Sequence, residues 1–72
     1  MQETMYRGYR VRYHKVAEWF AHIYRPGASS MMSEKPKATG QEGEALLMVR
    51  VRAIIDREEE ARQAKEKSNK GD

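Results

Sequence analysis

"YRGYRVRYHKVAEWFAHIYR", residues 6–25, is the stretch that decides the fold expected for this chain. Its first part, residues 7–13, alternates between apolar and basic side chains, and residues 18–24 form a second run rich in strand-forming residues. A period of two is typical of a strand that buries one face, so the stretch predicts two antiparallel strands. The inward face of the first strand would carry Tyr9, Val11 and Tyr13.

The inward face of the second strand has to be chosen, because both of its faces carry apolar residues. We choose the face with Ala21 at its centre, since a small residue there leaves room for a helix; the inward set is Trp19, Ala21 and Ile23. Directly opposed residues of an antiparallel pair share a face, so this choice requires a loop with an odd number of residues. The shortest such loop, residues 15–17, would place Arg12 opposite Phe20. An even loop would mean that the second strand is inverted.

The second half of the chain predicts a short strand and then a helix. Residues 31–35 could form a strand that ends at Pro36 and therefore lies at a sheet edge. The sequence TGQE, residues 39–42, is typical of a capping box at the start of a helix. Five apolar residues then share one stripe of the helical wheel, as a core-facing helix requires: Leu47, Met48, Val51, Ile54 and Ile55.

This order of elements predicts an α+β fold, a small three-stranded antiparallel sheet packed on one C-terminal helix. The chain has 72 residues and no cysteine, so we expect one small domain without disulfide support. We expect a loose N-terminus over residues 1–5 and the β-β-β-α domain over residues 6–60. Residues 61–72 would form a charged helix end and a disordered tail.

Charge and composition set looser limits on function. The formal net charge is +3, which is modest for a protein that binds nucleic acid. The longest apolar run, ALLMV, is too short to cross a membrane, and no signal peptide is visible. We therefore expect a soluble, cytoplasmic protein with no membrane partner.

The sheet face turned away from the helix is the first candidate site, because it combines cations with rings. Cations contact phosphates, rings stack on unpaired bases, and arginine can read guanine in a major groove. We therefore expect a surface for DNA or RNA formed by Arg10, Arg12, Lys15, Phe20, His22, Tyr24 and Arg25. The alternative is an ordinary solvated or protein-covered sheet face, on which Arg12 over Phe20 is a structural cation–π pair.

A second, minor apolar stripe on the predicted helix is the other candidate surface. Leu46, Val49 and Ala53 lie away from the core-facing stripe, beside Ala45. An exposed apolar stripe marks an interface, so these three residues are our candidates for a homodimer contact. The alternative is that Met1, Met5 or the 26–38 loop covers the stripe.

Catalytic and metal-binding patterns do not emerge from the sequence. Two histidines, scattered carboxylates and the absence of cysteine make a poor metal site. The serines have no evident base, and the sequence GQEG lacks the spacing and the lysine of a phosphate loop. We expect a protein that is not an enzyme and uses no cofactor and no metal.

The succession of strands and helix over residues 6–58 resembles two known small architectures. One is the sheet and helix of integrase arm-binding domains and plant AP2-type domains, which place the sheet in a DNA major groove. The other is the sheet and helix of HicB-like antitoxins. The Y-R-G-Y start and the W-x-A-x-I-x-x-P-G pattern are also similar to those of short bacterial proteins of unknown function, a resemblance that implies no activity.

These observations predict a small non-enzymatic binding protein that contacts nucleic acid through its basic aromatic sheet face. The rival prediction is a protein-interaction module, or a small regulatory inhibitor of the antitoxin type, that docks on an acidic protein partner. A salt titration separates the two, because contacts with several phosphates weaken steeply with salt.

Overall fold

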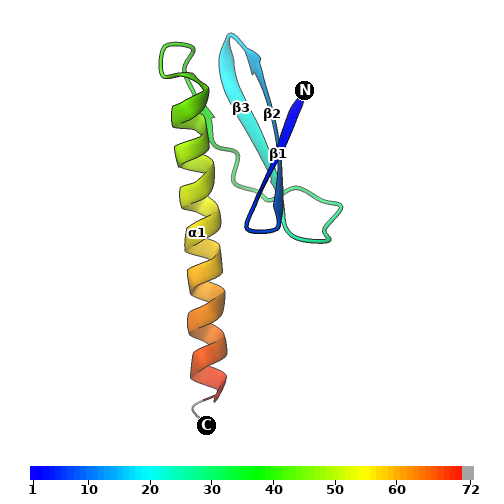
Figure 1. The fold of residues 1–72 in the computed structure, drawn as a ribbon, viewed down its shortest axis with the longest axis vertical. Helices are drawn as coiled ribbons and strands as arrows, with labels where there is room; N and C mark the ends of the chain where they lie inside the picture. The colour runs from blue at the N-terminus through cyan, green and yellow to red at the C-terminus, as the bar shows by residue number, and fades with distance from the viewer. Residues whose placement is uncertain (71–72) are drawn as a thin grey trace.

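The computed structural model describes residues 1–70, with side chains described as far as residue 65. Four strands precede one long helix, and each strand pairs antiparallel with the next one along the chain (Figure 1). The elements are β1 (Gln2–Tyr6), β2 (Tyr9–Val16), β3 (Glu18–Tyr24), β4 (Lys37–Ala38) and α1 (Gly43–Lys70). The predicted α+β class is confirmed. The sheet has four strands rather than the predicted three, because β1 and the short β4 flank the central β2–β3 hairpin.

The N-terminus is a strand, so the prediction of a loose start over residues 1–5 is wrong. β1 pairs with β2 through the register Tyr6↔Tyr9. The two residues between them, Arg7 and Gly8, have φ angles of 53° and 85°. A two-residue hairpin turn needs such positive angles, which glycine adopts freely and arginine does not. Arg7 is fixed there by an ion pair with Asp56 of α1, at 2.9 Å.

The β2–β3 hairpin has the predicted faces but a different register. Arg12 lies opposite His22 rather than Phe20, so the register is offset by two residues from the expected one. The strands extend to Val16 and Glu18 and leave Ala17 alone between them, with a φ of 63°. The loop is therefore odd, as the chosen faces required, but shorter than expected.

The predicted strand over residues 31–35 is wrong, because its place is taken by an interrupted segment. Met31 forms an isolated bridge with Tyr24, and the short β4 follows only after Pro36. In between, the Ala21 N–H donates to the Pro36 carbonyl at 3.1 Å. Proline has no N–H to donate, so it joins the edge of the sheet through its carbonyl alone.

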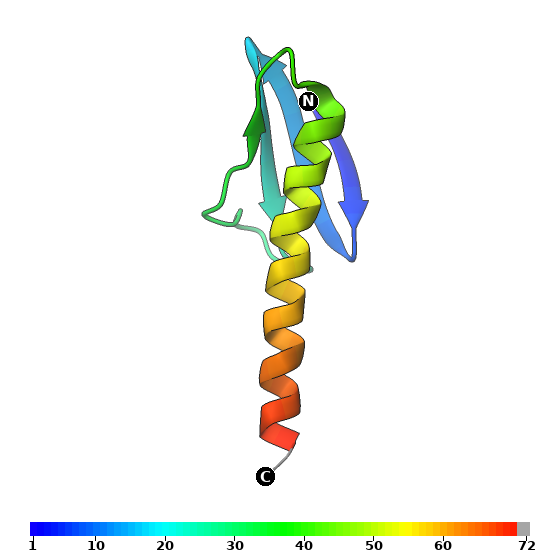
Figure 2. The same cartoon turned by 90° about the vertical axis from the view of Figure 1, so that its left-hand side faces the viewer.

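The helix begins at the predicted capping box. The Thr39 N–H donates to Glu42 Oε1 at 2.9 Å, and the Glu42 N–H donates to Thr39 Oγ1 at 3.1 Å. α1 then crosses one face of the sheet (Figure 2). The core forms between the helix and this inner face, with relative exposure of 8% or less, and comprises Tyr9, Val11, Tyr13, Ala21, Ile23, Met32, Ala38, Leu47, Val51 and Ile55.

The last part of α1 extends beyond the sheet (Figure 1). α1 runs as far as Lys70 and so includes residues 61–70 of the segment for which a charged helix end and a disordered tail were predicted. Residues 71–72 lie outside the described residues. No helix in the described part of the chain combines the length and apolar character that a membrane span requires.

Candidate functional site

The face of the sheet opposite α1, called the outer face below, is built from rows of residues that the register aligns. Residues paired across antiparallel strands point to the same side, so each row can be followed from strand to strand. The first row is Met5, Arg10, Tyr24 and Met31; the second is Glu3, Arg12 and His22; the third is His14, Phe20 and Lys37. The structure thus brings five of the seven predicted nucleic-acid-binding residues together on one surface.

Arg10 is held in place by two neighbours on this face. Its guanidinium carbon lies 4.6 Å above the centroid of the Tyr24 ring, and its Nε lies 3.3 Å from Glu3 Oε2. The cation–π contact fixes the plane of the side chain, and Glu3 offsets part of its charge. Arg10 is therefore an ordered but partly neutralised cation.

Arg12 and Lys37 are the more available cations of the outer face. Both are exposed, and neither forms an ion pair among the described residues. Arg12 stands between Glu3 and His22 in the second row, and Lys37 stands beside Phe20 in the third. An anion that approached this face would meet these two charges without displacing an existing partner.

Three rings pack against one another in the middle of the outer face. His14 stacks on Phe20 and on His22, each with centroids 5.8 Å apart and interplanar angles of 28° and 24°. The Nδ1 atoms of both histidines are buried and make no hydrogen bond within the described part of the chain. The pKa of His22 is lowered from its ordinary value by burial first, and then by the positive charges of His14, Lys35 and Arg12. His22 is therefore a neutral ring at pH 7.

Lys15 does not belong to the outer face, contrary to the prediction. It pairs with Trp19 in the register, which places it on the helix side of the sheet. The Lys15 side chain lies against the loop that precedes α1, which agrees with this placement. Its Nζ is 3.8 Å from the point that a Cβ atom on Gly40 would occupy. The error follows from the expected loop, which removed Lys15 from the strand.

Arg25 is committed to the helix rather than available as a phosphate contact. Its Nε and Nη2 each donate to a Glu58 oxygen at 2.9 Å. This pair raises the pKa of Arg25 and lowers the pKa of Glu58. Arg25 also borders an open hollow of about 300 Å³ at the end of the first row, whose lining is Met5, Gly8, Arg10, Tyr24, Arg25, Gly27 and Ala28.

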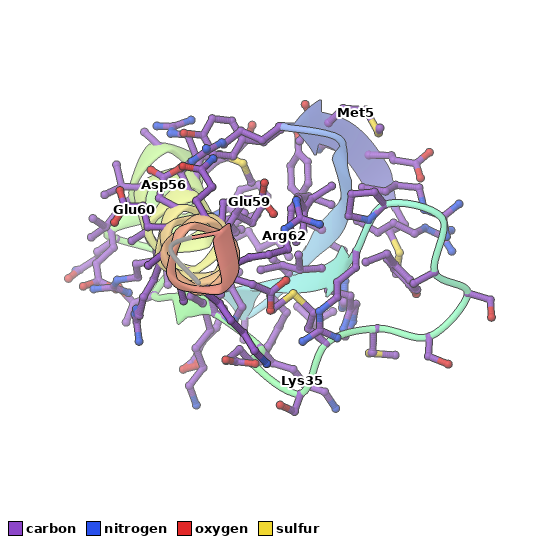
Figure 3. All side chains as sticks on the ribbon, turned by 90° about the horizontal axis from the view of Figure 1, so that it is seen from below. Met5, Lys35, Asp56, Glu59, Glu60 and Arg62 are labelled. Carbon is purple, nitrogen blue, oxygen red and sulfur yellow. The ribbon has the colours of Figure 1, made fainter. Side chains whose placement is uncertain are left out.

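On the other side of the sheet, tyrosines contact carboxylates of α1, a feature that the sequence analysis missed. Tyr6 donates to Asp56 Oδ1 at 2.9 Å, and the Tyr9 hydroxyl lies 2.6 Å from Glu58 Oε2 and 2.8 Å from Glu59 Oε2. Glu59 also pairs with Arg62, and both lie on the side of α1 toward the sheet, while Glu60 points the other way (Figure 3). These contacts hold the helix to the sheet, and no local pattern in the sequence announces them.

The minor helix stripe points away from the sheet. Val49 is 52% exposed and Ala53 is exposed, whereas Leu46 is half-buried. Met5 lies on the outer face of the sheet and therefore does not cover this stripe. The assignment of these three helix residues to a homodimer interface stays a prediction.

No group of three or more metal-ligating side chains occurs among the described residues. Comparisons with protein-family models, with curated proteins and with solved structures each return no match for this chain.

Proposed function

We propose that the outer face binds nucleic acid, and unpaired DNA or RNA strands in particular. The observation that supports this proposal is the gathering of cations and rings on a sheet face that α1 does not cover. Sheets of this kind can bind single strands by stacking bases on exposed rings while cations contact the backbone. The residues that would act together are Arg10, Arg12, Phe20, His22 and Tyr24.

The rings favour unpaired bases over a duplex. Phe20 and His22 each stack on His14 and are only half-buried, so part of each ring surface is exposed to solvent. Stacking of one base on an aromatic side chain contributes about 1–3 kcal/mol and tolerates different sequences. A neutral His22 serves this role better than a charged one, because its ring can be desolvated at lower cost.

The cations supply a small electrostatic contribution. Arg12 and Lys37 are the cations available for phosphate contacts, because Arg10 already forms an ion pair with Glu3. Single strands lose affinity with a log–log salt slope of about −0.7 for each neutralised phosphate, so two contacts predict a slope of about −1.4. Binding by this face is therefore expected to be weak to moderate and only mildly dependent on salt.

An NMR titration of the labelled chain tests the proposal. We expect oligo(dT) and oligo(U) to shift the amides of β2 and β3 at low salt, and a duplex of the same length to shift them less. Arg12→Glu should weaken binding and reduce the salt slope by about 0.7. Arg57→Glu is the matched control, because Arg57 is an exposed cation on α1 and the charge change is identical. Equal losses for both variants would contradict a specific site on the outer face.

A protein partner is the second candidate for the same face. Met5 and Met31 close the two ends of the first row and are 62% and 43% exposed. Methionines adapt their shape to a partner surface, and the neighbouring arginines would suit an acidic one. If no oligonucleotide shifted the amide signals and the chain captured an acidic protein in a salt-resistant way, these results would favour this function.

A further inference from the structure

β1 leaves one long edge of the sheet open. Its five residues pair with β2 on one side, and none of the described residues pairs with the other side. Unpaired N–H and C=O groups along such an edge are a template for another strand. The edge therefore needs either a partner or a feature that blocks pairing.

The opposite edge of the sheet is already covered by the chain itself. β4 pairs with Trp19 and Phe20, and the Met32 N–H donates to the Ile23 carbonyl at 2.7 Å. The Pro36 carbonyl accepts from the Ala21 N–H between these two contacts. Residues 31–38 thus line β3 along most of its length, in contrast to β1.

The devices by which proteins usually block an open edge are missing from β1. The strand, QETMY, contains no proline and no glycine, and its register with β2 runs without a bulge. Its single charge, Glu3, points to the outer face and already pairs with Arg10. Inward-pointing charges and prolines are the usual protection, so this edge is permissive for strand addition.

The helix also leaves room beside β1. Its contacts with β1 and the following turn are at the end of the strand, where Tyr6 and Arg7 reach Asp56. Gln2 and Thr4 point to the helix side; Thr4 is half-buried and Gln2 is exposed. β1 forms the outer edge of the sheet, and its arrowhead lies beside α1 rather than behind it (Figure 2).

We propose that β1 pairs antiparallel with β1 of a second copy of this chain, about a two-fold axis at Thr4. This register is self-complementary. Thr4 lies opposite Thr4 of the second copy, a favourable cross-strand pair, and Gln2 lies opposite Tyr6. Glu3 lies opposite Met5, so no two like charges face each other. The pairing also covers part of Met5, which is 62% exposed in the single chain.

The resulting dimer has one continuous eight-stranded sheet with a helix on the same side at each end. Because the two outer faces become one surface, a nucleic-acid strand or an acidic protein would meet both copies at once. The pairing does not depend on that function, since it follows from the open edge and the β1 sequence alone.

The minor helix stripe is the competing contact. It offers Leu46, Val49 and Ala53, after which Asp56, Arg57 and Glu60 continue the same side of the helix with charges. A helix pair of this type needs apolar residues sustained over about three to four heptads. The stripe is shorter than that, so the β1 edge carries the stronger case.

Single-cysteine variants test the geometry directly, because the chain has no cysteine of its own. In the proposed register the two Cβ atoms at position 4 lie about 4.5–5.5 Å apart, close to disulfide range. Thr4→Cys should therefore form a covalent dimer under mild oxidation. Gln2→Cys is the matched control, because the two copies of residue 2 would lie about 13 Å apart along the strand direction. Val49→Cys reports on the helix stripe.

Sedimentation of the full chain supplies an independent measurement. We expect a dimer for the unmodified chain and for Thr4→Val, and a folded monomer for Thr4→Lys, whose two lysines would face each other. Circular dichroism checks that the monomer is folded. The proposal is overturned if the unmodified chain sediments as a monomer at every concentration. It is equally overturned if Val49→Cys cross-links and Thr4→Cys does not, or if Thr4→Lys remains a dimer.

Discussion

Arg25 and Glu58 form two parallel hydrogen bonds, Nε to Oε2 and Nη2 to Oε1, both at 2.9 Å, and so join the end of β3 to α1. The pair spans 33 residues of sequence and lies next to the Tyr9 hydroxyl, which contacts the same carboxylate. A residue expected to bind phosphate is thus part of the link between sheet and helix.

We predict that Arg25→Gln lowers stability but leaves ligand binding by the outer face unchanged. The arginine side chain is 54% exposed, so solvent screening keeps the loss in unfolding free energy small. Urea denaturation measures that loss, and the oligonucleotide titration measures binding. A loss of binding with unchanged stability would return Arg25 to the site.

Tyr9→Phe should destabilise the chain more strongly. Tyr9 is 2% exposed, and its hydroxyl contacts Glu58 and Glu59 at 2.6 and 2.8 Å. Hydrogen bonds to charged groups contribute about 1.5–3 kcal/mol to stability, so we expect the loss in unfolding free energy to lie near the lower end of that range. Tyr24→Phe is the control, because Tyr24 makes no hydrogen bond through its hydroxyl among the described residues. Similar losses of unfolding free energy in both variants would contradict the assignment.

The capping box should make stability depend on pH in the acid range. The Arg50 side chain first, and then the Thr39 backbone N–H, lower the pKa of Glu42 from its ordinary value of 4.5 to about 2. The folded chain therefore holds this proton less tightly than the unfolded chain. The contribution is complete above pH 4.5 and is lost as the pH falls from 4.5 toward 2. We expect Glu42→Gln to flatten the stability curve over this interval, as followed by urea denaturation at several pH values; an unchanged curve would contradict the cause.

His22 should titrate below its ordinary pKa of 6.5, because burial is the largest cause of the shift and the charge of His14 comes second. A lowered pKa means that His22 favours the folded state above pH 6.5 and that this contribution falls as the pH drops below that value. His14→Phe keeps a ring beside His22 and removes the charge. We expect NMR titration of this variant to show a His22 pKa that rises slightly but stays below 6.5. A full return to 6.5 would show that charge, not burial, dominates.

The central hairpin could be predicted from sequence because its side chains differ strongly between faces. Val11 and Ile23 are inside and Arg12 is outside, so the period of two is visible. In β1 the contrast is absent, since the inner face carries the polar Gln2 and Thr4 while the outer face carries the apolar Met5 beside Glu3. The Arg7–Gly8 turn was equally hard to recognise, because one of its two positive φ angles belongs to an arginine.

The candidate site was predictable where strand parity decides it. Arg10, Arg12, Phe20, His22 and Tyr24 share a face because they occupy alternate positions of two paired strands. Lys15 could have been placed correctly by the same parity, since it lies two residues after Tyr13. Arg25 could not, because its commitment depends on Glu58, a residue brought near only by helix docking.

The strands lie in the sheet in the same order as in the chain, so the sheet forms from contacts between neighbouring segments. Contacts between distant segments arise mainly when α1 packs on the sheet. The β1–β2 and β2–β3 pairings close tight turns, whereas the docking of α1 on β1 and β2 joins residues roughly 30 to 50 positions apart, as in Tyr9 and Glu58. A chain that ended before α1 would keep its hairpins but expose Val11, Ala21 and Ile23, which are fully buried in the complete fold. Such a truncated chain would combine an open edge with an uncovered apolar face, and aggregation rather than an isolated folded sheet is its expected fate.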